Sequence, residues 1–236
     1  MIHRLDGLTP GAIDLTSLAG RQGRGVRVAV IDSGVHGPHP HVGGRVDAGV
    51  SFDAGGTAGN DIADRLGHGT AVAAAIREKA PEAVLIPVTV FHRELRATAD
   101  ALVAAIAWAV EARVDLINLS LGTANPAHKR RLGEVLVAAA RAGVCLVAAD
   151  AQDGTEWLPG SLPLAVGVTL DWSLPRERAL VDVTMEGPVR RVRLRASGYP
   201  RPIPGVPPER NLKGISFAVA NATGLLARHL EPEARR

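Results

Sequence analysis

The sequence predicts an α/β protein in which a mostly parallel central sheet carries helices on both of its faces. Runs of consecutive apolar, often β-branched residues, such as 26–32 and 144–149, are typical of parallel strands that are covered on both sides. These runs alternate with longer segments that are rich in strong helix formers. The composition agrees, because 46% of the residues are apolar and only 3% are aromatic, which suits a closely packed core of sheet and helices.

The strands and helices follow one another in regular order from residue 26 onwards. The first strand ends at Asp32, and the first long helix is expected to begin at His68. The elements expected after it are strand 83–90, helix 96–113, strand 114–122, helix 126–143 and strand 144–149. Ligands gather at the carboxyl ends of the strands in such sheets, so these ends are where a site is expected.

The last third of the chain predicts a further strand, a hairpin, a loop and a helix. The strand is expected within 162–170, and the hairpin pairs 181–185 with 190–196. The arginines of the hairpin are expected to form its solvated face: Arg190, Arg191, Arg193 and Arg195. A proline-rich loop over 199–210 leads to a final helix that begins near Gly214. Because no linker interrupts the pattern, residues 1–236 are interpreted as a single domain.

Composition argues against several classes of function. The formal net charge is only +3, and three Trp, three Phe and one Tyr offer few rings for stacking bases, so a nucleic-acid partner is not expected. Cys145 is the sole cysteine, which rules out an intramolecular disulfide. No segment reaches the roughly 18 apolar residues of a membrane helix, and the N-terminus lacks the apolar stretch of a signal peptide. A cytoplasmic protein without a membrane partner is therefore expected.

Three residues carry the chemistry that the sequence predicts. Asp32, His68 and Ser216 each stand among glycines and small residues, in the segments DSG, GHGT and GIS, at a strand end or a helix start. A serine hydroxyl becomes a good nucleophile when a nearby histidine removes its proton. That imidazole in turn needs an acid, which fixes its tautomer and stabilises its charged form. The combination indicates nucleophilic catalysis.

The segments around these residues resemble the subtilisin family of serine peptidases, also called subtilases or peptidase family S8. The similar segments are VAVIDSGVHGPHPHVGGRV, DRLGHGTAVAAAI, VDLINLSLG and LKGISFAVANATGLLA, in the family's chain order of Asp, His and Ser. The resemblance implies a subtilisin-like three-layer fold. It also implies that Ser216 attacks a peptide carbonyl, that His68 acts as base and then as acid, and that Asp32 orients His68.

The resemblance further implies where a peptide or protein substrate binds. An extended peptide is expected to lie along Leu119 to Gly122 as an added strand. Main-chain hydrogen bonds would then give affinity that does not depend on the side chains of the peptide. The pocket for the residue before the cleaved bond is expected between two short segments. These substrate-binding residues are Ser120, Leu121, Gly122, Ala148, Ala149 and Asp150.

Two positions near the nucleophile depart from the family pattern. The family presents an Asn side chain to the oxyanion, whereas this chain reads AADAQDG there and offers Gln152 as the expected donor. Ile215 stands where the family has Thr. Loss of one oxyanion donor lowers turnover by about 100- to 1000-fold. Two functions therefore stay open: a serine endopeptidase, of low activity or dedicated to one substrate, and a catalytically impaired relative that binds a peptide or protein.

No cofactor is expected. Three histidines, His36, His39 and His41, crowd one loop, but the resemblance already accounts for that loop and no metal site is inferred there. A structural calcium ion stays open as an alternative, because four residues that could supply oxygen ligands lie close in sequence: Asp53, Asn60, Asp61 and Asp64. Their spacing, however, is not that of a dense calcium-binding loop.

Overall fold

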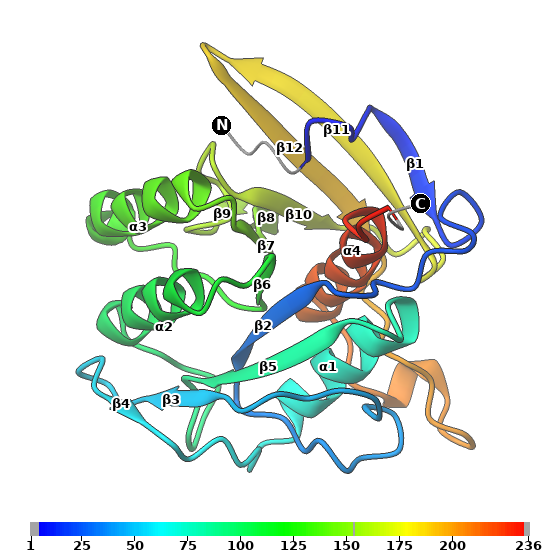
Figure 1. Cartoon of the computed structure of the whole chain (residues 1–236), viewed down its shortest axis with the longest axis horizontal. Helices are drawn as coiled ribbons and strands as arrows, with labels where there is room; N and C mark the ends of the chain where they lie inside the picture. Colours follow the sequence, from blue (N-terminus) through cyan, green and yellow to red (C-terminus); the bar gives the residue numbers. More distant parts are fainter. Residues whose placement is uncertain (1–4, 153, 234–236) are drawn as a thin grey trace.

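The computed structural model describes residues 5–152 and 154–233, which form two sheets and the helices around them (Figure 1). The strands of the large sheet are β1 (Gly11–Asp14), β2 (Arg27–Asp32), β3 (Val50–Phe52), β4 (Ala58–Gly59), β5 (Val84–Thr89), β6 (Leu116–Leu119), β7 (Cys145–Ala149), β10 (Val166–Leu170), β11 (Arg178–Glu186) and β12 (Val189–Ala196). Their order across this ten-stranded sheet is β1-β11-β12-β10-β7-β6-β2-β5-β3-β4. The small sheet pairs β8 (Ala151–Gln152) with β9 (Thr155–Glu156).

The large sheet is parallel through its middle, from β12 across to β3. The strands at its two sides, β1, β11 and β4, pair antiparallel. Apart from Arg27 at the start of β2, the central strands β2, β5, β6 and β7 are buried along their whole length, which explains why their sequences are largely continuous apolar runs. The edge strands β1 and β4 carry no sequence signal, because they are short and partly exposed.

Four α-helices cover the two faces of the sheet in the described part of the chain. They are α1 (His68–Lys79), α2 (Ala99–Glu111), α3 (Lys129–Arg141) and α4 (Ile215–His229); two short 3₁₀ turns, Pro126–His128 and Pro208–Arg210, precede α3 and α4. Helices α1 and α4 pack together on one face, and α2 and α3 pack together on the other (Figure 1). The predicted α/β class, with helices on both faces, is confirmed. None of these helices combines the length and apolar character needed to cross a bilayer.

The topology brings the chemistry-bearing residues to one edge of the sheet. Asp32 ends β2, and Ser120 follows β6, the strand next to it. Asp150 follows β7, the next neighbour. The carboxyl ends of parallel strands meet at one edge, and α1 and α4 start there with His68 and Ser216 in their first turns.

The hairpin of β11 and β12 corrects one expectation from the sequence. Its arginines do not share a solvated face, because Arg191 is only 7% exposed. The Arg191 guanidinium pairs with Asp150, and that of Arg190 donates to the main-chain oxygens of Leu5 and Leu8. A buried carboxylate needs a charged partner, and β12 supplies it. Arg195, with more than half of its side chain exposed, is solvated as expected.

Candidate active site

Asp32 and His68 form a buried pair at the end of β2. Asp32 is fully buried and His68 is 9% exposed. The Nδ1 atom of His68 lies 2.7 Å from Oδ1 of Asp32, which also accepts the main-chain N–H of Ser33 at 2.8 Å. The other carboxylate oxygen, Oδ2, is buried without a hydrogen-bond partner among the described residues. With Nδ1 engaged, Nε2 is the ring atom of His68 left for proton transfer.

The environment of His68 favours its charged form. Burial by itself lowers the pKa of the imidazole, but the hydrogen bond and the charge of Asp32, together with the charge of Asp64, raise the pKa of His68 above its usual 6.5. An imidazole in this setting takes up a proton readily from a neighbouring hydroxyl, because its carboxylate partner stabilises the imidazolium that forms.

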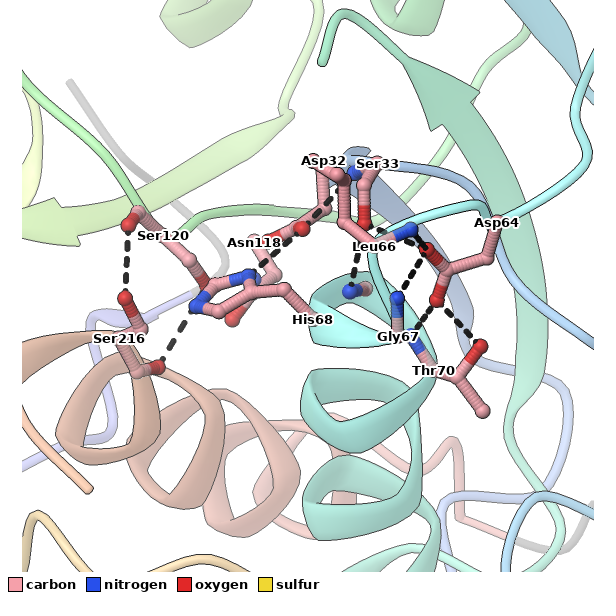
Figure 2. A network of polar contacts seen from close by, with 11 residues as sticks. Asp32, Ser33, Asp64, Leu66, Gly67, His68, Thr70, Asn118, Ser120 and Ser216 are labelled. Carbon is pink, nitrogen blue, oxygen red and sulfur yellow. Dashed lines mark hydrogen bonds and ion pairs between the residues drawn. The ribbon is translucent and has the colours of Figure 1, made fainter. Parts of the chain in front are cut away.

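A second carboxylate, Asp64, holds the loop that leads into α1 (Figure 2). Its two oxygens accept hydrogen bonds from the main-chain N–H groups of Leu66, Gly67 and Thr70 and from the Thr70 hydroxyl. The hydroxyl of Ser33 also donates to Asp64, and accepts the N–H of Gly69. The pKa of Asp64 lies below its usual value: burial raises it, but hydrogen bonds from Thr70, Ser33 and Gly67 outweigh this effect. Asp64 thus fixes the position of His68 relative to Asp32.

Ser216 is the second residue of α4 and lies near His68 and Ser120 (Figure 2). Its hydroxyl donates to the main-chain oxygen of Ser120 at 3.1 Å. Among the described residues no hydrogen bond joins this hydroxyl to His68. The two side chains are nevertheless neighbours, because both line one cavity and the ring of Phe217 lies 5.8 Å from that of His68, centroid to centroid. The structure therefore brings Asp32, His68 and Ser216 to one place.

A buried polar chain connects β6 to α4 beneath the nucleophile. The amide of Asn118 donates to the Ser120 hydroxyl at 2.8 Å, and its oxygen accepts the Thr223 hydroxyl at 3.0 Å. Asn118 and Thr223 are fully buried. Such satisfied buried networks fix the relative position of the elements that they join. Here they set the distance between the Ser120 edge and the start of α4.

The cleft is a cavity of about 290 Å³ lined by ten residues: His68, Phe91, Leu95, Ser120, Leu121, Gly122, Ala149, Trp157, Ile215 and Ser216. Of the substrate-binding residues expected from the sequence, Ser120, Leu121, Gly122 and Ala149 line it. Ala148 and Asp150 are not among its lining residues. Ala148 is fully buried in β7, and Asp150 is buried, with its side chain beside Arg191 and Arg193. Gln152 ends the short strand β8, but its side chain lies outside the described residues.

Three residues of the site escaped the sequence prediction as functional residues. Phe91 and Leu95 line the cavity from the segment between β5 and α2, and Trp157 lines it from the segment after β9. None of them stands in a motif, so no local signal marks them. For Asp64 the sequence suggests only an alternative calcium ligand, although its place four residues before His68 is a signal that could reveal its role.

The carboxylates of the segment left open as an alternative calcium position have protein partners. Asp53 accepts the main-chain N–H groups of Gly55 and Thr57, and Asp61 pairs with Arg65. Within the described ranges no group of three or more His, Cys, Asp or Glu side chains is arranged to hold a metal ion.

Comparison with known proteins gives one family match and several relatives. The model of the subtilase family matches residues 23–161. The major intracellular serine protease of Bacillus subtilis (strain 168) is 34% identical over 146 residues, which cover 57% of this chain and 45% of the relative. Subtilisin NAT of Bacillus subtilis subsp. natto is 28% identical over 226 residues, covering 89% of this chain and 55% of the relative. The chain thus spans about half the length of these curated relatives.

Solved structures agree with the fold. Sphericase superposes with a TM-score of 0.67 at 24% identity, and the match covers 95% of this chain and 80% of that one. The prenylagaramide maturation protease PagA superposes with a TM-score of 0.61 at 25% identity, with 90% of this chain and 77% of that one covered. The predicted subtilisin-like fold is confirmed.

Proposed function

The chain belongs to the subtilase family of serine peptidases, and we propose that it is an endopeptidase that hydrolyses peptide bonds through Asp32, His68 and Ser216. The observation that carries this proposal is the 2.7 Å contact between His68 and Asp32, in a cleft that the Ser216 hydroxyl shares. A buried Asp–His pair beside a serine is the arrangement that activates a hydroxyl as nucleophile.

The proposed reaction has two stages. Ser216 Oγ bonds to the peptide carbonyl carbon while its proton passes to His68 Nε2, and the carbonyl oxygen becomes an oxyanion. His68 then gives that proton to the leaving amine as the C–N bond breaks, which leaves an acyl group on Ser216. In the second stage a water molecule, deprotonated by His68, releases the acyl group and restores the hydroxyl. These steps use only groups of the protein and a water molecule, so the proposal requires no cofactor.

Oxyanion stabilisation is assigned to the start of α4. Ser216 is the second helical residue, where main-chain N–H groups have no acceptor within the helix and the helix dipole favours negative charge. Gln152 is proposed as the second donor, in place of the family's Asn. Because Ile215 brings an apolar side chain to the cavity, the N–H of Ser216 and the amide of Gln152 carry the stabilisation between them.

Substrate binding is proposed to free the nucleophile. In the structure the Ser216 hydroxyl donates to the Ser120 carbonyl. An extended substrate that adds as a strand along β6 and Ser120–Gly122 needs this carbonyl as an acceptor for its own N–H. When the substrate N–H takes the carbonyl, the Ser216 hydroxyl is released and turns to His68.

The substrate is proposed to be a peptide or protein, and the location cytoplasmic. Two of the similar curated proteins are named as intracellular serine proteases, which supports the location. The similar structure PagA is titled a maturation protease, which supports a substrate that is one dedicated peptide. The small net charge of +3 fits the proposal that no nucleic acid is bound.

A second candidate function is a subtilase-fold protein that binds a peptide without cutting it. The absence of a hydrogen bond between the Ser216 hydroxyl and His68 among the described residues favours it, as do Gln152 and Ile215. Such a protein would use the same cleft and the same extended binding mode, with a peptide or protein as partner.

Reaction with a small fluorophosphonate, followed by intact mass, separates the two candidates. If the endopeptidase proposal holds, the wild type gains one adduct, and the variants Ser216→Ala and His68→Ala gain none. Ser173→Ala serves as the control, because it removes an exposed serine that does not line the cavity. It is expected to label like the wild type. A wild type that stays unlabelled, under conditions in which a known serine peptidase reacts, would refute the endopeptidase and favour the peptide-binding candidate.

A further inference from the structure

Trp157 lies in the part of the cleft that the substrate's side chain must enter. It lines the same cavity as Ser216, Gly122 and Ala149. Its side chain lies against Gly122 so closely that a methyl group there would come within 2.9 Å of the Trp157 Cβ and 3.6 Å of its Cε3. The whole cavity, about 290 Å³, falls just under the range of about 300–1,000 Å³ that is usual for ligand sites. The indole therefore packs against one wall of the cavity, Ser120–Gly122, and lines the cavity together with a second wall at Ala149.

The main chain around Trp157 is fastened to both walls. Its N–H donates to the main-chain oxygen of Asp150 at 2.7 Å. The next residue, Leu158, exchanges two hydrogen bonds of 2.9 Å with Thr123, directly after Gly122. Because the segment Trp157–Leu158 bridges the two walls, the main chain that carries the indole is held in place beside the cleft.

The Ala149 wall is itself supported by the next residue, Asp150, which two arginines from the hairpin hold. The Asp150 carboxylate is 2.8 Å from Nε of Arg193 and 3.3 Å from Nη2 of Arg191. Its side chain reaches β12 across β10 at Gly167, where a methyl group would come within 2.9 Å of Asp150. Gly167 thus makes room for an ion pair that crosses a strand. A buried carboxylate held by two guanidinium groups is a rigid support for the loop above it.

From this arrangement we propose that Trp157 is a specificity-determining residue, which restricts the side chain before the cleaved bond to small residues such as Gly, Ala or Ser. The inference rests on the proposed peptidase function and names the substrate class of the same site. A bulky side chain entering between Gly122 and Ala149 would meet the indole, which packs against Gly122 and whose main chain is bonded to both walls. Small side chains leave the indole in place.

The test compares two peptidyl phosphonate diphenyl esters that are identical except for Ala or Phe at the position before the phosphorus. Each transfers its phosphorus to Ser216 with release of phenol, and intact mass gives the labelling rate. The wild type is expected to react at least about 10-fold faster with the Ala probe, a ratio within the usual range for steric discrimination in a pocket. In Trp157→Ala the preference is expected to vanish or reverse. Trp157→Phe keeps a ring in the cleft and retains the Ala preference.

The controls distinguish a failed inference from a failed function. The indole Nε1 is buried without an acceptor among the described residues, so Trp157→Phe breaks no hydrogen bond and is the matched control for stability. The wild-type comparison stands even if Trp157→Ala unfolds. Equal rates with both probes, or a preference unchanged in a folded Trp157→Ala, would overturn the inference while leaving the peptidase intact. No labelling by either probe or by a small fluorophosphonate would overturn the peptidase proposal and this inference with it.

Discussion

At the scale of single residues, two carboxylates divide the task of preparing His68. Asp32 bonds to the imidazole itself, at 2.7 Å. Asp64 bonds to the loop that carries it, through Gly67 and Thr70, and adds a negative charge nearby. Ser33 links the two, because it follows Asp32 and its hydroxyl donates to Asp64. One carboxylate therefore sets the protonation of His68, and the other sets its place.

The raised pKa of His68 predicts the pH dependence of the proposed activity. Burial lowers this pKa, but Asp32 and Asp64 raise it above 6.5. The neutral imidazole is the base, so the labelling rate of Ser216 is expected to increase with pH, with a midpoint above pH 6.5. At pH values below the midpoint the imidazole is protonated and labelling is slow. Asp32→Asn is expected to lower the midpoint and slow labelling by about 10⁴-fold. Both expectations are checked by measuring the labelling rates of the wild type and Asp32→Asn across about pH 5–9.

Asp61→Asn is the matched control for that pH profile. Asp61 is an exposed carboxylate on the same loop as Asp64, paired with Arg65 and not with His68. Its variant is expected to keep the wild-type midpoint. A wild-type midpoint at or below 6.5, or an equal shift in the control, would contradict the assignment of the raised pKa to Asp32.

At the scale of elements, the site depends on how closely α1 approaches the turn after β2. Gly69, the second residue of α1, lies where a methyl group would come within 2.1 Å of the main-chain oxygen of Gly34 and 3.2 Å of the Asp32 side chain. Only a residue without a side chain allows this contact. The close approach of helix and turn is what brings His68 within hydrogen-bond distance of Asp32.

Gly69→Ala is therefore expected to abolish labelling of Ser216 and to destabilise the fold by about 1–3 kcal/mol, as other overpacked sites do. Gly133→Ala is the matched control, because Gly133 lies inside α3 with nothing within 4 Å of the added methyl group. It is expected to stabilise the protein by about 0.5–1 kcal/mol and to label normally. Urea unfolding and fluorophosphonate labelling measure both effects. Normal labelling in Gly69→Ala would show that the close approach is unnecessary.

At the scale of the whole molecule, hydrogen bonds join the end of α4 to the end of α1 and to the segment before β2. Arg228 in α4 donates to the main-chain oxygens of Lys79 and Arg21, and Arg21 donates to that of His229. Lys79 itself is fully buried at the end of α1, where it pairs with Glu78. That a single domain spans residues 1–236 stays a prediction.

Lys79 makes global stability depend on pH. Burial lowers its pKa from 10.5 to about 8, whereas in the unfolded chain the pKa keeps its usual value. Below pH 8 both states are protonated and the buried charge destabilises the fold. Between about pH 8 and 10.5 the unfolded state binds more protons, so this destabilisation is relieved as the pH rises. Relative to Lys79→Met, the wild type is expected to gain on the order of 2–3 kcal/mol over that window.

Urea unfolding of the wild type and Lys79→Met at pH 7, 8.5 and 10, values that bracket the window, checks this expectation. Glu78 keeps Arg176 as a partner in the variant, so no buried carboxylate loses its only cation. Lys129→Met, at an exposed position of α3, is the control and is expected to show a difference from the wild type that does not change with pH. A constant difference for Lys79→Met as well would contradict the lowered pKa.

The sequence by itself determined the alternation of strands and helices and the three residues of the proposed triad. These features are encoded by contiguous residues: apolar runs predict β2, β6 and β7, and small residues next to Asp32, His68 and Ser216 permit close approach. Because strands that alternate with helices are parallel, their carboxyl ends are expected at one edge of the sheet, whatever their order.

Only the tertiary structure decided the roles of Asp150, Arg191 and Trp157. Asp150 and Arg191 are separated by 41 residues, and they meet because β12 lies beside β10, which lies beside β7. No local pattern encodes that order, so the hairpin arginines could not be assigned to a buried pair from sequence. Trp157 likewise enters the cleft because hydrogen bonds to Asp150 and Thr123 place its main chain there. Contacts between distant segments depend on the packed sheet, and the packed sheet therefore shapes the specificity pocket.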